Sequence, residues 1–368
     1  MSRTAKRNRQ ARWLGVVTLA VAGVWAAGPV PGTAADRVSS SLETGLQASV
    51  LVRARELQRL RSLLVSIGGE VVEEHYFHGA SARRPENLKS ASKSILSLLV
   101  GIAIDRRYLA GIDQPIAGFF PRFFAATEDD RKAAITIEDL LTMRSGLETT
   151  SNRSYGRWVQ SANWVWHVLS RPLVDQPGGR MIYSTGSTHL LSAILTQATG
   201  MSTLAFGRRY LAEPLGIELP AWQQDPQGIY FGGNEMQLTP PAMLKIGELF
   251  LRSGTLEGRE VVSEGWVRAS LTPRTRSRFS GRQYGYGWWT RPLGGRQAHY
   301  AWGYGGQFIF VVPDLDLVVV MTSTPTPGDE RRAHLGALYD LVEEEIIPAA
   351  ERRVAAERPP VRPEAAGF

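Results

Sequence analysis

A serine and a lysine three residues apart, Ser90 and Lys93, open a long apolar segment of the chain. In a helix that begins at Ser90, the two side chains lie one turn apart on the same face. A lysine amine can accept the proton of a neighbouring serine hydroxyl when burial and nearby charge lower the pKa of the amine. The free backbone N–H groups of the first helical turn stabilise negative charge that develops on an oxygen atom. The spacing therefore predicts a nucleophilic serine with a lysine as its base.

The alternative is that Ser90 is one more serine at the start of a buried helix, because a pattern this short also arises by chance. However, the chain has only five lysines, and only Lys93 follows a serine by three positions. The segment behind it, residues 95–102, is apolar on most faces of the expected helix. A charged amine in a buried helix is costly without a function or a partner, so the catalytic interpretation is favoured.

Two further segments contain groups that a serine nucleophile needs. Tyr183 stands in a short extended stretch before a predicted helix, and a phenol near a lysine ammonium can act as a general base or proton shuttle. Taken alone, this pattern better fits a tyrosine that packs at the start of a helix. Segment 301–312 (AWGYGGQFIFVV) has glycines within a β-rich run, which let another group approach the backbone closely. It either donates a second N–H to an oxyanion or forms a bulge, and the pattern alone favours neither.

The elements that must position these groups are strands near both ends of the chain and helices in its middle. Segment 62–79 predicts a hairpin that turns at Gly68-Gly69. Three more β-rich segments lie at 284–290, 299–313 and 315–324, with turns at Gly294-Gly295 and Pro313-Asp314. Helical patterns lie at 36–60, from Ser90 onward, and at 135–148, 161–170, 243–254 and 333–347. This order predicts an α+β fold in which an antiparallel sheet from the N- and C-terminal segments carries an inserted helical lobe.

In their order along the chain, three motifs resemble the serine β-lactamase and penicillin-binding protein superfamily. They are S-x-x-K at 90–93, Y-S-x from Tyr183, and the glycine-rich β segment. The chain is most similar to class C β-lactamases, type VIII carboxylesterases and 6-aminohexanoate-dimer hydrolases. Supporting stretches are ITIEDLLTMRSGL, QPGGRMIYSTGSTHLLSAILTQATG and LAEPLGI, and the resemblance covers about residues 60–325. It implies a β-lactamase/transpeptidase-like fold and a serine hydrolase that works through an acyl-enzyme.

The resemblance also implies a role for each matching residue. Ser90 would be the acylated nucleophile and Lys93 its proton-accepting partner. Tyr183 would be the base for attack and would protonate the leaving group. The oxyanion hole would use the Ser90 N–H and an N–H near Gly306 or Gln307.

The sequence departs from the family pattern at two positions that bear on substrate binding. The Asn usual in the tyrosine motif is replaced by Thr185, whose hydroxyl is shorter than an amide and lacks its separate donor and acceptor. The third motif usually begins with Lys or His, the cation that helps to hold the carboxylate of a β-lactam, and here begins with Gly303 or Tyr304. Trp302 and Tyr304, beside Gly305, would instead line the substrate site with aromatic surface. These departures argue against efficient β-lactam turnover and favour an ester or a simple amide.

Other kinds of site find little support in the sequence. There is no cysteine, no H-E-x-x-H and no G-x-S-x-G, which argues against thiol chemistry, a zincin site and an α/β-hydrolase. His75 and His78 have opposite parity on a predicted strand, so they are unsuited to share a metal. His189 is interpreted as structural, and the Gly-Gly-Asn stretch 232–234 is expected to border the pocket. No cofactor and no metal are expected.

The basic character of the chain comes from its N-terminus. Residues 1–35 carry five basic residues and no acidic one, and subtracting these from the formal net charge of +7 leaves +2 for the rest. A nucleic-acid partner is therefore not expected, because no basic stripe is interleaved with aromatics. The basic start, the apolar run from Trp13 to Val30 and the small residues before Ala35 predict an export signal. The alternative is an uncleaved membrane anchor.

The sequence thus predicts a signal peptide at 1–35, a β-lactamase-related serine hydrolase domain at 36–347 and a disordered tail at 348–368. The protein is expected to be periplasmic or secreted, with no membrane span in the mature chain, and to act on a small-molecule ester or amide. Two alternatives stay open: a β-lactamase or D,D-peptidase, and a non-catalytic ligand-binding homologue. The natural substrate and the oligomeric state stay open as well.

Overall fold

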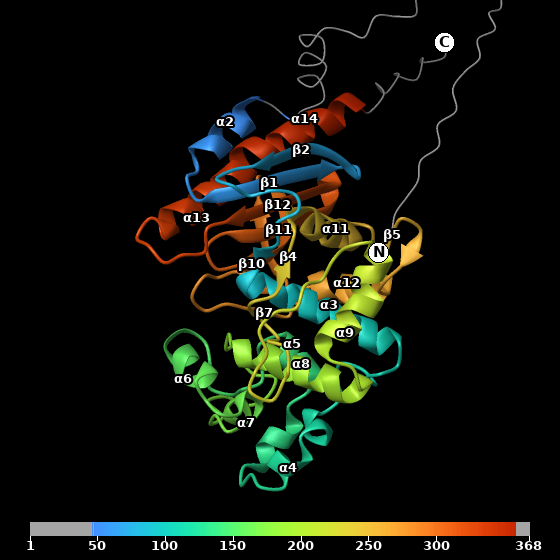
Figure 1. The fold of residues 1–368 in the computed structure, drawn as a ribbon, viewed down its shortest axis with the longest axis vertical. Helices are drawn as coiled ribbons and strands as arrows, with labels where there is room; N and C mark the ends of the chain where they lie inside the picture. Colours follow the sequence, from blue (N-terminus) through green and yellow to red (C-terminus); the bar gives the residue numbers. More distant parts are fainter. Residues whose placement is uncertain (1–45, 47, 358–368) are drawn as a thin grey trace, which may run out of the picture. The chain divides into compact units, whose positions relative to one another are not determined.

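Strands from the two ends of the chain form one antiparallel sheet, which confirms the predicted α+β class (Figure 1). The computed structural model describes residue 46 and residues 48–357, so the predicted signal segment 1–35 lies outside the described residues. The strand order is β2-β1-β12-β11-β10-β9-β8-β7. The strands are β1 (Leu60–Ile67), β2 (Glu70–Tyr76), β7 (Thr275–Arg276), β8 (Gln283–Tyr284), β9 (Trp289–Leu293), β10 (Arg296–Gly303), β11 (Gln307–Val312) and β12 (Leu317–Ser323). Two small sheets pair β3 (Glu86–Asn87) with β4 (Gln237–Leu238) and β5 (Thr255–Leu256) with β6 (Arg259–Glu260).

The central strands are buried on both faces because their side chains alternate between two hydrophobic cores. On β11, Phe308 and Phe310 belong to one core, whereas Ile309 and Val311 belong to the other. This period of two is the pattern of a pleated strand, and burial on both faces requires helices on each side. The predicted hairpin between β1 and β2 is confirmed, and both turn glycines, Gly68 and Gly69, have positive φ.

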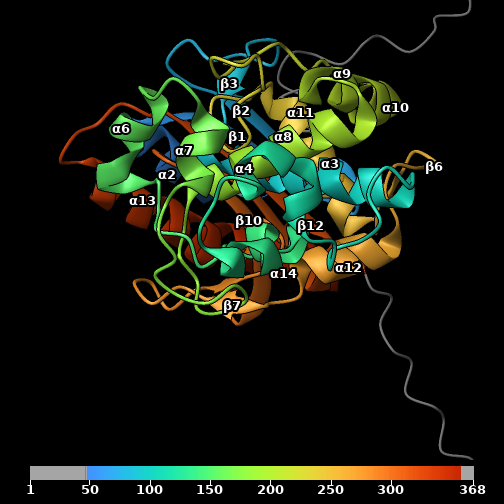
Figure 2. The same cartoon turned by 90° about the horizontal axis from the view of Figure 1, so that it is seen from below.

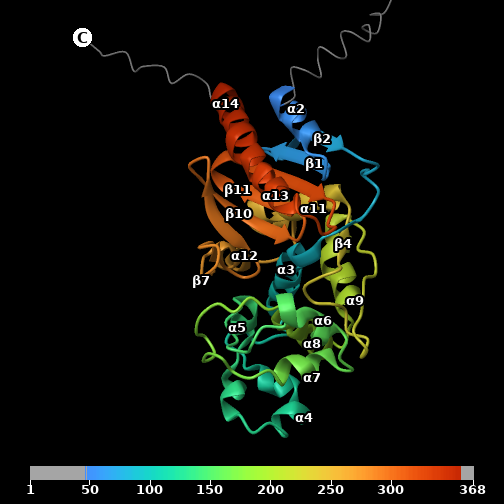
Figure 3. The same ribbon diagram turned by 90° about the vertical axis from the view of Figure 1, so that its left-hand side faces the viewer.

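Helices cover the two faces of the sheet (Figure 3). On one side lie α2 (Ala48–Glu56), α13 (Arg331–Asp340) and α14 (Ile347–Glu357), and on the other α11 (Pro240–Leu251) and α3 (Ser92–Asp105). The prediction of disorder from residue 348 is wrong for 348–357, which belong to α14. Ala349 and Ala350 are buried, so their contacts with the rest of the domain stabilise a segment whose composition alone favours disorder.

The remaining helices form the inserted lobe and the edges of the domain (Figures 1 and 2). Viewed from below in Figure 2, α4 and α7 stand in front of the sheet. These helices are α4 (Pro121–Phe124), α5 (Ile137–Leu141), α6 (Tyr155–Val159), α7 (Trp164–Leu169), α8 (Thr185–Thr199), α9 (Thr203–Gly207), α10 (Glu213–Leu215) and α12 (Glu264–Leu271). The short 3-10 turns are η1 (Lys89–Ala91), η2 (Ile116–Phe119), η3 (Asp130–Ala134), η4 (Asn152–Ser154) and η6 (Pro313–Leu315), and the π-helical turns are η5 (Arg208–Ala212) and η7 (Leu341–Ile346).

The prediction of one strand over 284–290 is wrong, because β8 ends at Tyr284 and β9 begins at Trp289. Two other local predictions are wrong as well. Segment 299–313 is not one strand, because β10 ends at Gly303 and the chain reverses into β11 at Gln307. Segment 135–148 is helical only in α5, after which Met143 adopts a φ of 61°. In both places a residue in the left-handed region ends an element that the apolar pattern would have continued.

Within the described part of the chain, no single helix is long and apolar enough to cross a membrane. The bent pair Thr185–Thr199 and Thr203–Leu215 passes that test of length and composition only when its two helices are taken together.

Candidate active site

Ser90 lies in η1, the 3-10 turn that leads from β3 into the buried helix α3. Its side chain is half-buried, whereas Lys93, one turn further on, is only 2% exposed. No hydrogen bond to the Ser90 N–H is formed by the part of the chain that the structure describes. The predicted nucleophile is therefore accessible, with its own backbone donor free and a lysine beside it.

The buried amine of Lys93 is held by three neutral oxygen atoms. Its Nζ donates to the carbonyl of Gly233 at 2.7 Å, to Ser90 Oγ at 3.2 Å and to Thr185 Oγ1 at 3.3 Å. None of these acceptors carries a charge, and burial lowers the pKa of Lys93 to about 7. A substantial fraction of the amine is therefore neutral near pH 7, with a lone pair available to the Ser90 hydroxyl.

Tyr183 approaches the same two residues from the extended segment before α8. Its ring centroid lies 5.2 Å from Lys93 Nζ and 6.1 Å from the ring of Trp289, on which it stacks. Burial raises the pKa of Tyr183 to about 12, and a side-chain hydrogen bond with Ser90 partly opposes this rise. The phenol is therefore protonated at neutral pH, which suits it to donate a proton rather than to accept one.

A parallel pair of short segments, 149–151 and 183–185, fixes Tyr183 and Thr185, and sequence reasoning missed the first of them. Thr149 Oγ1 donates to the Tyr183 carbonyl at 2.7 Å, and Ser151 Oγ accepts from the Thr185 N–H at 2.8 Å. Ser151 Oγ also lies 3.0 Å from Thr185 Oγ1, so it orients the hydroxyl that contacts Lys93. No local motif distinguishes Ser151 from the other serines of the chain.

The glycine-rich motif forms the turn between β10 and β11, and both strands pack against η1. A Cβ atom at Gly303 would lie 2.0 Å from the carbonyl oxygen of Leu88, so only glycine permits this approach. The Gly306 N–H donates to the Gly303 carbonyl at 3.2 Å, and the Gln307 side chain bonds the backbone of Ser323. Both groups are thus engaged within the fold.

The free N–H groups of this turn belong to the two residues before Gly306. Among the described residues, neither the Tyr304 N–H nor the Gly305 N–H has an acceptor. The aromatic ring of Tyr304 is 39% exposed. The Tyr304 N–H is therefore better suited than the engaged N–H of Gly306 to donate to an oxyanion.

The Gly-Gly-Asn stretch contacts the site directly, through its second glycine. A Cβ atom at Gly233 would lie 2.1 Å from Thr188 Oγ1, so a larger residue could not present its carbonyl to Lys93 in this way. His189 is fully buried, with Nε2 3.0 Å from Asp225 Oδ2 and Nδ1 3.4 Å from the Gly232 N–H that it accepts. These contacts support the structural interpretation of His189.

The sequence profile described as Beta-lactamase matches residues 54–344, which include all the residues of this site. The chain belongs to the beta-lactamase family. A 6-aminohexanoate-dimer hydrolase of Paenarthrobacter ureafaciens is 25% identical to it in an alignment of 296 residues, with a coverage of 74% of this chain and 74% of that protein. The identification as a member of a hydrolase family with this fold agrees with the resemblance found in the sequence.

Solved structures show the same fold for this beta-lactamase family member. A penicillin-binding protein homologue from Caulobacter crescentus superposes with a TM-score of 0.62 at 18% identity, over 81% of this chain and 99% of its own. A family VIII carboxylesterase superposes with a TM-score of 0.61 at 16% identity, over 80% of this chain and 98% of its own.

A cleft of about 550 Å³ opens beside Tyr183, a volume typical of small-molecule sites. Its lining is mixed: Val174, Met181 and Ile182 are apolar, whereas Glu148, Arg180 and Arg278 are charged. Phe279, which is fully exposed, stands at its edge. The cleft can therefore hold a small-molecule group beside Tyr183.

We expect Lys93→Met to raise the free energy of unfolding by about 3 kcal/mol at pH 6, because it removes a buried amine without a charged partner. The pKa of Lys93 is lowered from 10.5 to about 7 on folding. Between these values the unfolded chain binds more protons, so wild-type stability rises with pH there. The advantage of the variant should therefore shrink as the pH rises from 7 to 10.

Urea unfolding of both proteins at several pH values measures this difference. Lys245→Met, on α11, is the matched control because the Lys245 side chain is 37% exposed, and it should not raise the free energy of unfolding at pH 6 as Lys93→Met does. A stability difference that is the same at every pH would contradict the lowered pKa.

Proposed function

We propose that this protein is a serine hydrolase that cleaves an ester or a simple amide through an acyl-enzyme on Ser90. The observation that carries the proposal is the contact of Ser90 with a buried lysine whose pKa is lowered to about 7 without a carboxylate partner. Such an amine is a base at neutral pH, and a base beside a serine hydroxyl is what acyl transfer requires.

In the first half-reaction, Ser90 Oγ attacks the acyl carbonyl while its proton moves to the neutral amine of Lys93. The Ser90 and Tyr304 N–H groups, which have no acceptor among the described residues, would donate to the oxyanion. Tyr183, protonated at neutral pH, gives its proton to the leaving group as the carbon–heteroatom bond breaks. The Lys93 ammonium then returns a proton to the tyrosine, which leaves the acyl group on Ser90.

In the second half-reaction, water replaces the leaving group. Because Lys93 and Tyr183 are both neutral again after acylation, the proton transfers can run in the reverse sense: Tyr183 passes its proton to the Lys93 amine and takes the proton of the water that attacks the acyl carbonyl. The tetrahedral intermediate collapses with the proton returning to Ser90 Oγ, and the acid product leaves. The same groups serve both halves because each proton transfer of acylation is reversed in deacylation.

The nature of the cleft supports an apolar acyl or alcohol group in the substrate. Val174, Met181 and Ile182 line the space next to Tyr183, and Tyr183 itself stacks on Trp289, which packs edge-on against Trp302. Ester and amide hydrolysis also agrees with the names of the relatives, a 6-aminohexanoate-dimer hydrolase and a family VIII carboxylesterase. The basic, then apolar N-terminal segment supports export to the periplasm or the medium.

Ser90→Ala should abolish ester turnover while leaving the thermal midpoint within a few degrees of wild type. The substitution removes one oxygen from a half-buried position, so the fold should hold while the nucleophile is lost. Intact mass after treatment with a fluorophosphonate, with p-nitrophenyl acetate turnover in parallel, measures both effects. Ser97→Ala, which removes an unpartnered hydroxyl from the adjoining helix α3, is the control and should be labelled like wild type. Labelling of the Ser90→Ala protein would place the nucleophile elsewhere.

The pH dependence of kcat/KM should report the lowered pKa of Lys93. We expect the rate to rise through an apparent pKa of about 7 and then to level off, because the neutral amine is the active form. A phenolate base at Tyr183, with a pKa of about 12, would instead make the rate climb steadily above pH 9. Turnover of a p-nitrophenyl ester from pH 5.5 to 10, corrected for spontaneous hydrolysis, distinguishes the two.

A p-nitrophenyl ester should be preferred over nitrocefin by a factor of about 100 or more in kcat/KM, because no cation stands at Gly303 to hold a β-lactam carboxylate. Thr185→Asn restores the amide of the family motif but not that cation, so nitrocefin turnover should stay low in this variant. Steady-state rates of both proteins on both substrates test this expectation. A large gain in nitrocefin turnover from Thr185→Asn would favour the β-lactamase alternative, and tight binding without any turnover would favour the non-catalytic one.

A further inference from the structure

The nucleophile follows a residue with an unfavourable backbone conformation. Lys89, immediately before Ser90, has a φ of 49°, which lies in the left-handed region that non-glycine residues rarely adopt. Such a conformation costs about 1 kcal/mol or more and persists only where surrounding contacts impose it. The position of Ser90 Oγ therefore depends on what holds Lys89 in place.

The contacts that hold Lys89 converge on one carboxylate. The Lys89 N–H donates to Asn87 Oδ1 at 2.9 Å, and the Lys89 Nζ donates to Glu235 Oε1 at 3.0 Å. Asn87 Nδ2 donates to the other oxygen of the same group, Glu235 Oε2, at 2.6 Å. Glu235 thus binds both the left-handed residue and the side chain that caps its N–H.

Glu235 belongs to the segment that also holds the base. Two positions before it, the Gly233 carbonyl accepts from Lys93 Nζ at 2.7 Å. One position after it, the Met236 carbonyl accepts from the Leu88 N–H at 2.9 Å. Glu235 itself has a φ of 63°, so its backbone is fixed in a second unfavourable conformation.

The ion pair between Lys89 and Glu235 is only partly shielded from water. We therefore expect it to affect the conformation of the turn before Ser90 more than the stability of the whole domain. The side chains of Lys89 and Glu235 are 23% and 26% exposed. Pairs of this exposure contribute little to global stability. Loss of this ion pair would free the Lys89 backbone to change conformation without unfolding the domain. The main consequence would be a change in the position of Ser90 Oγ.

We propose that Glu235 is a positioning residue for Ser90, tying the turn before the nucleophile to the segment that carries the Lys93 acceptor. The proposal rests on the proposed function, because it assigns Glu235 to the same Ser90–Lys93 pair. Without the carboxylate, Lys89 relaxes towards negative φ and Ser90 Oγ leaves its place 3.2 Å from Lys93 Nζ. Displacements of about 1 Å at reacting atoms lower rates by about 100-fold.

Glu235→Ala is therefore expected to lower kcat by about 10- to 100-fold with KM within about threefold of wild type. Glu235→Gln is nearly isosteric and keeps an oxygen for Asn87, so its loss should be smaller. The decisive variant is Glu235→Ala in a Lys89→Gly background, since glycine adopts positive φ at no steric cost. In that background the loss caused by Glu235→Ala should fall to a few-fold, a rescue that a merely structural role would not produce.

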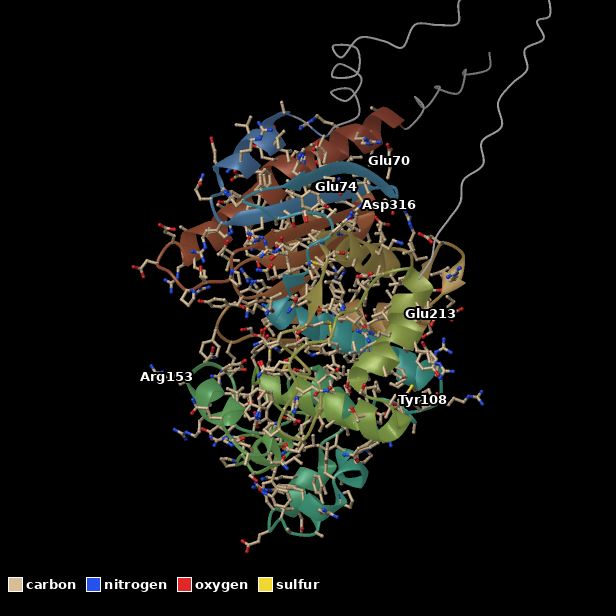
Figure 4. All side chains as sticks on the ribbon, viewed as in Figure 1. Glu70, Glu74, Tyr108, Arg153, Glu213 and Asp316 are labelled. Carbon is tan, nitrogen blue, oxygen red and sulfur yellow. The ribbon has the colours of Figure 1, made fainter. Side chains whose placement is uncertain are left out.

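A matched control exists at the other end of the sheet. Asp316, labelled in Figure 4, has a φ of 50° and is bound through both carboxylate oxygens by Arg252, at 2.8 and 2.9 Å. It accepts from the Gly68 N–H in the β1–β2 turn, away from η1. Arg252→Ala removes the partner of a left-handed residue as Glu235→Ala does, but should leave kcat unchanged.

The experiment compares the rate constant of fluorophosphonate labelling at Ser90 and the kcat for a p-nitrophenyl ester across these variants, each shown to be folded by circular dichroism. Slow labelling in Glu235→Ala, with rescue by Lys89→Gly, is the expected result. Wild-type rates in Glu235→Ala, or no rescue, would overturn the positioning role while leaving the proposed function intact. An unlabelled wild type would overturn both. If Glu235→Ala does not fold, Glu235→Gln replaces it under the same criteria.

Discussion

The site depends on a lysine amine that is buried without a negative partner. Transfer of a charged amine into a protein interior is strongly unfavourable, and the group responds by losing its proton more easily. A carboxylate next to Lys93 would restore the charge and remove the lone pair that Ser90 needs. The three contacts of Lys93 are instead neutral oxygens, from Ser90, Thr185 and Gly233. They orient the amine through hydrogen bonds while burial lowers its pKa.

That requirement explains why the helix carrying Lys93 is enclosed on all sides by segments distant in the sequence. Glycine permits the closest of these contacts. A Cβ atom at Gly303 would collide with the Leu88 carbonyl, and one at Gly287 would lie 2.9 Å from the Lys93 carbonyl. The Gly287 carbonyl in turn accepts from Ser94 Oγ at 2.6 Å. The end of β10 and the loop between β8 and β9 can therefore reach the backbone around the nucleophile, which larger residues would prevent.

Sequence reasoning reached the parts of this arrangement that are encoded locally. Ser90 and Lys93 share one helical turn, and the alternation of strands and helices is sufficient to predict the α+β class. The supporting residues could not be found in this way. Ser151 acts through a segment 34 residues away, and Glu235 contacts Lys89 across 146 residues. Such contacts leave no periodic pattern in the sequence, because they depend on which distant segments the fold brings together and not on the residues next to each position.

In the glycine-rich motif, the apolar pattern does not show where the chain reverses or which N–H groups the turn uses. Segment 299–313 is largely apolar, so its pattern is that of one buried strand, and the glycines Gly305 and Gly306, both with positive φ, reverse it. The reversal commits the Gly306 N–H to the turn and leaves the Tyr304 N–H without an acceptor among the described residues.

The two groups that carry protons in the proposed reaction, Lys93 and Tyr183, respond to burial in opposite directions. Burial moves the pKa of Lys93 down and that of Tyr183 up, because it disfavours the charged form of each. One environment thus prepares a neutral amine to receive a proton and a neutral phenol to give one, with no ionic group between them.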